Sequence, residues 1–311
     1  MEPYPRTFEP LLKEKIWGGR SLERYGKQLP DTLLIGESWE VADLPDSIPN
    51  GKSIINNGPL AGTLLEESFP LLIKFLDACD NLSVQVHPSK AYAANHPEAH
   101  LKSEAWIILD AAPAGKIYVG LKEGTTESAL REAIQTNSVP KLLNAIGVKK
   151  GECYYLPSGT CHALGGGVLV AEVQTPSDTT FRVWDWGRTG RKMHVDQAME
   201  CIDFNAPGII FEQSTPLKSG NFLTTHFVDT PFFSIERIES LEDAELELVI
   251  DETPVVLMVV EGRVSIQHAV PVDAPKGTTI LLPSGIQNAT MIMPKGAAVL
   301  RFDLPTPRLI V

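Results

Sequence analysis

Short stretches of alternating apolar and polar residues fill most of the chain, and turns rich in Gly, Pro and Asp separate them. From about residue 220 onward nearly every stretch has this pattern, which favours β-strands over helices. Strands are expected in this half at residues 232–237, 246–250, 255–260, 263–268, 279–283, 289–292 and 297–302. The pattern therefore predicts a mainly β fold.

A few helical segments interrupt the strands of the first half. Thr126 can cap a helix over residues 127–134, and Ser138 can cap a second, short helix that ends at Ile146. We interpret this helical segment, about residues 120–148, as an excursion from a barrel, because it is too short to be an independent domain. Another helix is expected at residues 195–201.

Two tryptophans lie in the N-terminal region, which is rich in turns and short strands. Trp17 falls in a stretch with two glycines at residues 15–20, which is typical of a loop. Trp39 falls in a mixed polar and apolar stretch at residues 36–43, which predicts a half-buried strand. Position alone favours core packing for both side chains.

Two strands carry polar residues on one face. Alternation places Ser83, Gln85 and His87 on one strand face, and Lys102, Glu104 and Trp106 on another. Gln85 and His87 are two chelating groups on the same face, so they can reach one metal ion. The other histidines nearby, His96 and His100, belong to a polar, helix-like insert and are interpreted as part of a solvated surface.

A Gly-x5-Pro-x4-His motif at residues 151–162 resembles the second signature motif of the cupin barrels, in which the His binds a metal. Residues 277–288 repeat the spacing and the Leu-Pro-Ser-Gly turn, but Asn288 stands where the first copy has His162. The repeat predicts two cupin-type β-barrel (jelly-roll) domains, at 1–215 and 216–311, with a boundary between about residues 200 and 225. The first domain is expected to bind metal, and the second is expected to be degenerate and metal-free.

The metal prediction rests on residues that converge if their strands form one barrel. These are Gln85, His87, Glu104 and His162, with Gln85 as a weaker fourth ligand. Two imidazoles, a carboxylate and an amide oxygen suit zinc, although iron, manganese or cobalt would also fit. Ligands from three strands leave one side open toward the barrel mouth, which is the pattern of a catalytic site.

Composition excludes several classes of partner. The 311 residues carry a net charge of -12, so the molecule as a whole repels nucleic acids and anionic membranes. Four single cysteines without a CxxC pair, and a polar N-terminus, favour a reducing cytoplasm without disulfides. No apolar run approaches the ~18 residues of a membrane helix. A small anionic substrate would need a local cluster of Lys and Arg.

Four segments together carry a more specific signal. They read Gln-Val-His-Pro at 85–88, Lys-Ser-Glu-Ala-Trp at 102–106, Leu-Pro-Ser-Gly-Thr-Cys-His-Ala at 156–163, and Glu-Val-Gln-Thr-Pro-Ser-Asp-Thr-Thr-Phe-Arg-Val-Trp-Asp-Trp at 172–186. This set resembles the type I mannose-6-phosphate isomerase family, and most of all its short bacterial form. The resemblance is dense over the first ~200 residues. It implies one zinc ion bound by His87, Glu104 and His162, with Gln at position 85, and an essential arginine at Arg182.

The resemblance also implies an activity. Members of the family interconvert mannose 6-phosphate and fructose 6-phosphate by moving a proton between C1 and C2, and a metal and Arg182 would stabilise the negative charge that develops on oxygen. Lys102 is expected either to transfer the proton or to bind anionic oxygens as a plain charge, and Trp17 is expected to contact substrate. Candidates for binding the phosphate are Lys15, Arg20, Lys102, Arg188 and Arg191.

Alternatives to this interpretation stay open. Alternation puts Thr180, Arg182 and Trp184 on one strand face, where a salt bridge from Arg182 to Asp185 would be a structural role. A cupin-type iron dioxygenase is a second function class, although Gln85 replaces the His that such enzymes commonly use. A non-catalytic sugar-phosphate-binding protein is a third. The sequence does not set the oligomeric state.

Overall fold

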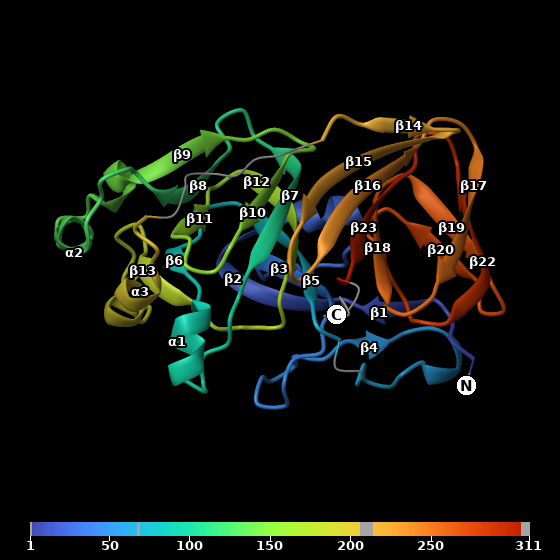
Figure 1. The fold of residues 1–311 in the computed structure, drawn as a ribbon, viewed down its shortest axis with the longest axis horizontal. Helices are drawn as coiled ribbons and strands as arrows, with labels where there is room; N and C mark the ends of the chain where they lie inside the picture. The colour runs from blue at the N-terminus through green and yellow to red at the C-terminus, as the bar shows by residue number, and fades with distance from the viewer. Residues whose placement is uncertain (1, 67–68, 206–213, 306–311) are drawn as a thin grey trace, which may run out of the picture.

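The computed structural model describes residues 2–66, 69–205 and 214–305, and its strands form four antiparallel sheets. Two sheets build the first half (Figure 1). The six-stranded sheet has the order β10 (Cys153–Leu156), β7 (Glu104–Ala111), β12 (Val168–Gln174), β5 (Leu72–Ala78), β3 (Ile35–Val41) and β2 (Leu11–Gly19). The five-stranded sheet has the order β13 (Phe181–Trp184), β6 (Val84–Val86), β11 (His162–Leu164), β8 (Lys116–Leu121) and β9 (Leu143–Gly147).

The other two sheets build the second half, which is orange to red in Figure 1. The eight-stranded sheet has the order β14 (Leu217–Ser219), β15 (Phe222–Asp229), β16 (Ser234–Ser240), β23 (Ala298–Asp303), β18 (Val255–Glu261), β21 (Thr279–Leu282), β1 (Arg6–Glu9) and β4 (Ile54–Ile55). The four-stranded sheet has the order β17 (Ala244–Ile250), β22 (Ile286–Met293), β19 (Arg263–Gln267) and β20 (Val272–Pro275). The mainly β fold is confirmed. Each of the seven strands expected in this half is present, with ends shifted by a few residues, and the strands at β14, β15 and β20 were not predicted.

The two halves share a hydrophobic core. Strand β12 shows the reason, since it is buried on both faces. Leu169, Ala171 and Val173 pack in a cluster with Ile235 and Phe302 of the second half. On the opposite face of the strand, Val170 packs inside the first half and Glu172 lines a cavity. A strand that is buried on both faces has a nearly continuous apolar sequence. The single charged residue of β12 therefore marks the face that has a different function.

Segments from the N-terminal region also connect the halves. Strand β1 pairs with β21 of the second half, with Thr7 opposite Ile280. A buried ion pair lies nearby, in which Lys27 Nζ is 2.7 Å from Glu40 Oε2 and donates to the Gly277 carbonyl at 2.8 Å. The boundary expected between 200 and 225 includes residues 206–213, which lie outside the described residues. The division into domains 1–215 and 216–311 stays a prediction.

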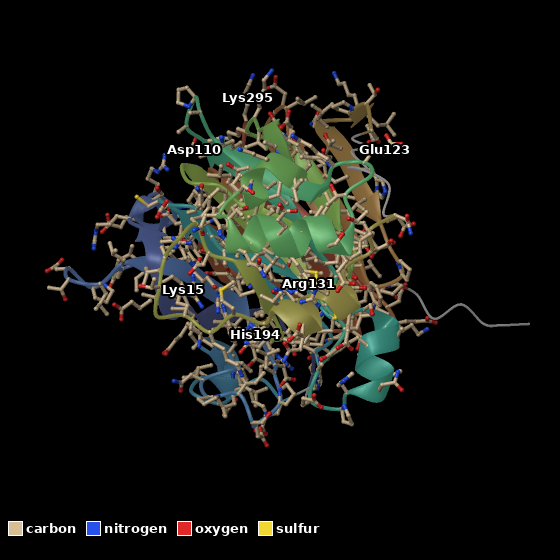
Figure 2. The ribbon with its side chains drawn as sticks, turned by 90° about the vertical axis from the view of Figure 1, so that its left-hand side faces the viewer. Lys15, Asp110, Glu123, Arg131, His194 and Lys295 are labelled. Carbon is tan, nitrogen blue, oxygen red and sulfur yellow. The ribbon has the colours of Figure 1, made fainter. Side chains whose placement is uncertain are left out.

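Three α-helices are described, α1 (Lys90–Asn95), α2 (Glu127–Gln135) and α3 (Val195–Cys201). Thr126 Oγ1 accepts from the Ala129 N–H at 3.2 Å, so the predicted cap of α2 is confirmed. Figure 2 shows α2 lying across this end of the molecule, where Arg131 is 2.9 Å from Asp196 Oδ1 of α3. The expected helix after Ser138 is wrong.

A short 3-10 turn (Val139–Leu142) and strand β9 occupy that segment instead. Ser138 makes no side-chain cap, and Pro140 cannot donate a backbone hydrogen bond to a helix. From Leu143 the chain pairs with β8, which satisfies its backbone groups within a sheet.

The expected loop at residues 15–20 is also wrong, because β2 continues through Trp17 to Gly19. Strand β3 is buried at all seven positions rather than half-buried, since Glu37 lines the cavity of the first half while Glu40, on the other face, pairs with Lys27. All four cysteines are free thiols, and only Cys79 is exposed. None of the described helices is long and apolar enough to cross a membrane.

Candidate active site

A cavity of about 260 Å³ opens between the two sheets of the first half. Its walls carry tryptophans and many charged groups, although the molecule as a whole is acidic. Trp17 and Trp39 line one side, so both are core residues that also contact the cavity. The charged and amide side chains of the lining are Lys15, Glu37, Lys74, Gln85, Lys102, Glu172, Asp178, Arg182 and Arg191.

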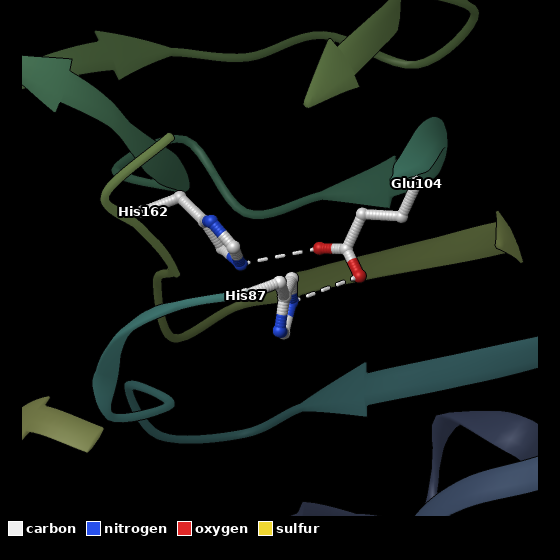
Figure 3. A group of neighbouring side chains, drawn as sticks. All are labelled: His87, Glu104 and His162. Atoms are coloured by element: carbon white, nitrogen blue, oxygen red, sulfur yellow. Dashed lines mark ion pairs between the residues drawn. The ribbon is translucent and has the colours of Figure 1, made fainter. Parts of the chain in front are cut away.

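Beside this cavity lies a buried triad of His87, Glu104 and His162 (Figure 3). Glu104 begins β7, His162 begins β11, and His87 follows β6, so three strands position the triad. His87 Nε2 is 3.2 Å from Glu104 Oε2, and His162 Nε2 is 3.2 Å from Glu104 Oε1. The structure therefore brings together the three residues for which the sequence predicted metal binding.

The histidine tautomers follow from the hydrogen bonds of the triad. His87 Nδ1 lies 3.2 Å from the Thr179 carbonyl, and His162 Nδ1 lies 2.8 Å from the Thr160 carbonyl. A carbonyl can only accept, so each Nδ1 carries the proton and each Nε2 presents a lone pair. Metal-binding histidines are commonly fixed in this way by a backbone carbonyl.

The four atoms that face one another are buried and make no hydrogen bond, although Glu104 Oε2 also lies in an ion pair with Lys102. They are His87 Nε2, His162 Nε2 and both carboxylate oxygens of Glu104. Buried polar atoms without partners are rare and costly, and a divalent cation would satisfy all four. Burial lowers the pKa of His87 to about 3, with the Lys102 charge acting in the same direction, so its imidazole is held neutral, as a metal ligand must be. The residues present fit a metal ion.

Lys102 links the triad to the cavity. Its Nζ is 2.9 Å from Glu104 Oε2, and its side chain is 7 % exposed. Burial alone would raise the pKa of Glu104, but the Lys102 ammonium outweighs it and holds that pKa well below its usual range. Glu104 is therefore a carboxylate, as metal ligation requires.

A second cluster of charged side chains lies on the six-stranded sheet. Lys74 Nζ is 2.9 Å from Glu172 Oε1 and 3.7 Å from Glu37 Oε2, and Lys15 Nζ is 3.0 Å from Glu37 Oε1. Burial, together with the nearby Glu104 charge, raises the pKa of Glu172. Burial would also raise the pKa of Glu37, but Lys74 and Lys15 outweigh it and lower that pKa to about 2. Two carboxyl groups on one wall thus differ in how readily they accept a proton.

Arg182 reaches the cavity from β13. Its Nη1 donates to the Lys192 carbonyl at 2.6 Å, while its Nε is buried and has no hydrogen-bond partner. The alternative salt bridge to Asp185 is not formed, because Asp185 instead accepts from Arg188 at 2.7 Å and from Arg191 at 3.1 Å. Burial and the charge of Arg191 lower the pKa of Arg182. Its guanidinium is thus free to bind an anion in the cavity.

One expectation around Arg182 was wrong. The register shifts between Arg182 and Trp184, so Arg182 is opposite Gln85 while Trp184 is opposite Val84. This bulge turns Trp184 to the outer face, where it packs with Phe181 and Val183. The alternating sequence pattern could not show that the bulge adds an extra residue to this strand.

Comparison with known proteins agrees with this geometry. The model of the type I phosphomannose isomerase catalytic domain matches residues 7–114. A mannose-6-phosphate isomerase of Streptococcus mutans is 33% identical over 310 residues, covering 91% of this chain and 94% of its own. The crystal structure of the Bacillus subtilis mannose 6-phosphate isomerase aligns with a TM-score of 0.86 at 30% identity, over 97% of this chain and 99% of that one. The chain belongs to the type I mannose-6-phosphate isomerase family. A mannose 6-phosphate isomerase structure bound with zinc and yttrium shares the fold, with a TM-score of 0.70 at 17% identity over 97% of this chain and all of that one.

Membership of this isomerase family makes the chain an enzyme, and the structure places the other residues expected at its site. Gln85 is the cross-strand neighbour of His162 and lines the cavity, but its ligation of metal stays a prediction. Among the expected anion-binding residues, Lys15, Lys102 and Arg191 line the cavity. Arg20 instead pairs with Glu23 on the exposed surface, and Arg188 is held by Asp80 and Asp185.

Sequence reasoning missed Lys74, Glu172, Glu37 and Asp178. A signal for the first two was present, since Glu172 is the single charged residue of buried β12 and Lys74 interrupts the apolar run of buried β5. Such residues are almost never fully buried unless they are paired. The histidines at 96 and 100 lie apart from the triad, where His96 stacks on Tyr92 and His100 is exposed.

Proposed function

We propose that this enzyme interconverts mannose 6-phosphate and fructose 6-phosphate by proton transfer between C1 and C2. The observation that carries the proposal is the cluster of four buried ligand atoms without a hydrogen bond, beside a cavity that contains an arginine without a carboxylate partner. A metal site and a free guanidinium together suit a reaction in which negative charge develops on substrate oxygens.

Zinc is the proposed metal, with one ion per chain. His87, Glu104 and His162 would hold it, with Gln85 as a weaker fourth ligand. Zinc commonly takes three protein ligands at catalytic sites and leaves a position for water or substrate. When bound, the ion would supply Lewis acidity that polarises a substrate oxygen.

The residues of the chain supply the other functions. Arg182 would bind the oxygen on which charge develops, through the guanidinium N–H groups that the Lys192 carbonyl does not use. Glu172 would take the proton from C2 of the aldose and return it to C1, because its raised pKa suits a group that both accepts and donates a proton. The ion pair of Lys102 with Glu104 supports a role as a fixed positive charge rather than as a base. Trp17 would form an apolar wall for the sugar.

The phosphate would bind to cations of the lining. Lys15 and Arg191 line the same cavity as Arg182, and these three positive side chains provide local attraction in a chain of net charge -12. The substrate is therefore expected to be a small anion that enters the cavity.

A coupled assay tests the proposal. The protein is stripped of metal with a chelator, reloaded with zinc, and supplied with mannose 6-phosphate while a coupling enzyme reports fructose 6-phosphate. We expect turnover that depends on zinc. Oxygen uptake by the iron-loaded protein would instead support a dioxygenase. Binding of mannose 6-phosphate without turnover under every metal condition would support a non-catalytic binding protein.

A further inference from the structure

The loop at residues 175–179 connects β12 and β13 and passes beside the triad. We propose that this loop positions His87 for metal binding, and that Gln174 and Ser177 anchor it. Neither side chain makes a hydrogen bond to the proposed metal ligands, so both are positioning residues. The inference rests on the proposed metal site, and it adds residues to which that site assigns no role.

Gln174 is the first anchor. It ends β12, opposite Glu104 of β7, and its side chain is fully buried. Its Nε2 donates to the Ser177 carbonyl at 2.6 Å and to the Thr175 carbonyl at 3.1 Å. Two carbonyl acceptors fix the orientation of the amide and close the start of the loop into a compact turn.

Ser177 is the second anchor, and it too is buried. Its Oγ donates to the His100 carbonyl at 3.1 Å and accepts from the Thr179 N–H at 3.2 Å. The hydroxyl thus uses both its donor and an acceptor position to hold two segments together. Removing it would leave two partly buried backbone groups without their partner.

The loop is also connected to the segment that leads into β7. Thr175 Oγ1 donates to the Leu101 carbonyl at 3.0 Å and accepts from the Ser103 N–H at 3.3 Å. That segment contains Lys102 and continues into Glu104. The loop therefore bridges two elements that carry triad residues or their partners.

The end of the loop fixes His87. The Thr179 carbonyl accepts from His87 Nδ1, which leaves Nε2 as the lone pair directed at Glu104. If the carbonyl shifted, the imidazole could rotate or exchange its tautomer, and the ligand geometry would be lost. Loss of such outer contacts typically lowers metal affinity by roughly 10- to 100-fold.

The test measures zinc affinity by competition with a chromogenic chelator in Ser177→Ala and Gln174→Leu. We expect the dissociation constant of each variant to rise by roughly 10- to 100-fold. Thr230→Val is the matched control, because Thr230 Oγ1 likewise donates to one backbone carbonyl and accepts from two N–H groups, but in the second half. The control is expected to bind zinc like the wild type.

The outcomes separate this inference from the metal proposal itself. A wild-type protein that binds no zinc would remove the metal site, whatever the variants do. A wild type that binds zinc, with both variants within about twofold of it, would overturn the role of the loop. An equal loss of affinity in Thr230→Val would also overturn it, since general destabilisation would then explain the effect. If Ser177→Ala does not fold, Gln174→Leu decides.

Discussion

Replacing Arg182 with lysine separates charge from geometry at the proposed site. Arg182 Nη1 donates one hydrogen bond to the Lys192 carbonyl, and the other N–H groups of the guanidinium are left for substrate. Lysine keeps the positive charge but replaces the planar guanidinium with one compact ammonium, which cannot serve both partners in the same geometry. Losing one charge-assisted donor that acts in the transition state costs roughly 2.7–4 kcal/mol, which corresponds to about 100- to 1,000-fold in kcat.

The assay for Arg182→Lys is steady-state turnover of mannose 6-phosphate, with zinc content measured on the same sample. Arg301→Lys is a suitable control, because Arg301 makes a bidentate pair with Asp303 in the second half and does not line the cavity. We expect the control to keep kcat within about threefold. If Arg182→Lys kept near-full kcat with normal zinc content, the reasoning would be refuted. Loss of the cooperative unfolding transition would instead show a structural role.

Further predictions follow from other contacts. Elemental analysis after zinc loading should find one tightly bound ion per chain, and two ions or none would contradict the single triad. Glu172→Gln should lower kcat by roughly 100- to 10,000-fold with unchanged zinc content, because the amide cannot move the proton, and kinetics near wild type would exclude Glu172 as the base. Lys27→Met should lower the free energy of unfolding by about 3–5 kcal/mol, because it leaves Glu40 buried and unpaired. Urea unfolding measures this loss, and Lys27→Met/Glu40→Leu should restore part of it.

The sequence predicted the triad because its ligands lie within patterns of period two. His87 and Glu104 each occupy an inward position of a strand or its end, and His162 follows a turn marked by Gly and Pro. Local pattern is enough to orient such residues. The same reasoning failed at Trp184, where a bulge adds one residue and reverses the face, and bulges leave no mark in alternation.

The local sequence pattern could not show which charged residues pair with one another. Arg20 and Arg191 look equivalent in the sequence, but Arg20 pairs with Glu23 on the surface while Arg191 reaches the cavity. Lys74 meets Glu172 only because β5 and β12 are neighbours in the sheet. Strand order depends on contacts between distant segments, so the sequence pattern could not rank these cations.

The repeated turn shows that a motif can keep its fold while losing its site. The second copy still requires glycine at position 277, because a Cβ there would lie 2.0 Å from the Tyr25 carbonyl oxygen. At its end, however, Asn288 is exposed in a left-handed conformation with φ 54°, whereas His162 is buried. Leu156, before the first turn, is opposite Glu104, whereas Leu282, before the second turn, is opposite Val255, so a valine stands where the first half has its carboxylate. A histidine restored at 288 would therefore lack the carboxylate partner, because a metal site requires matched polar residues on several strands and not the turn alone.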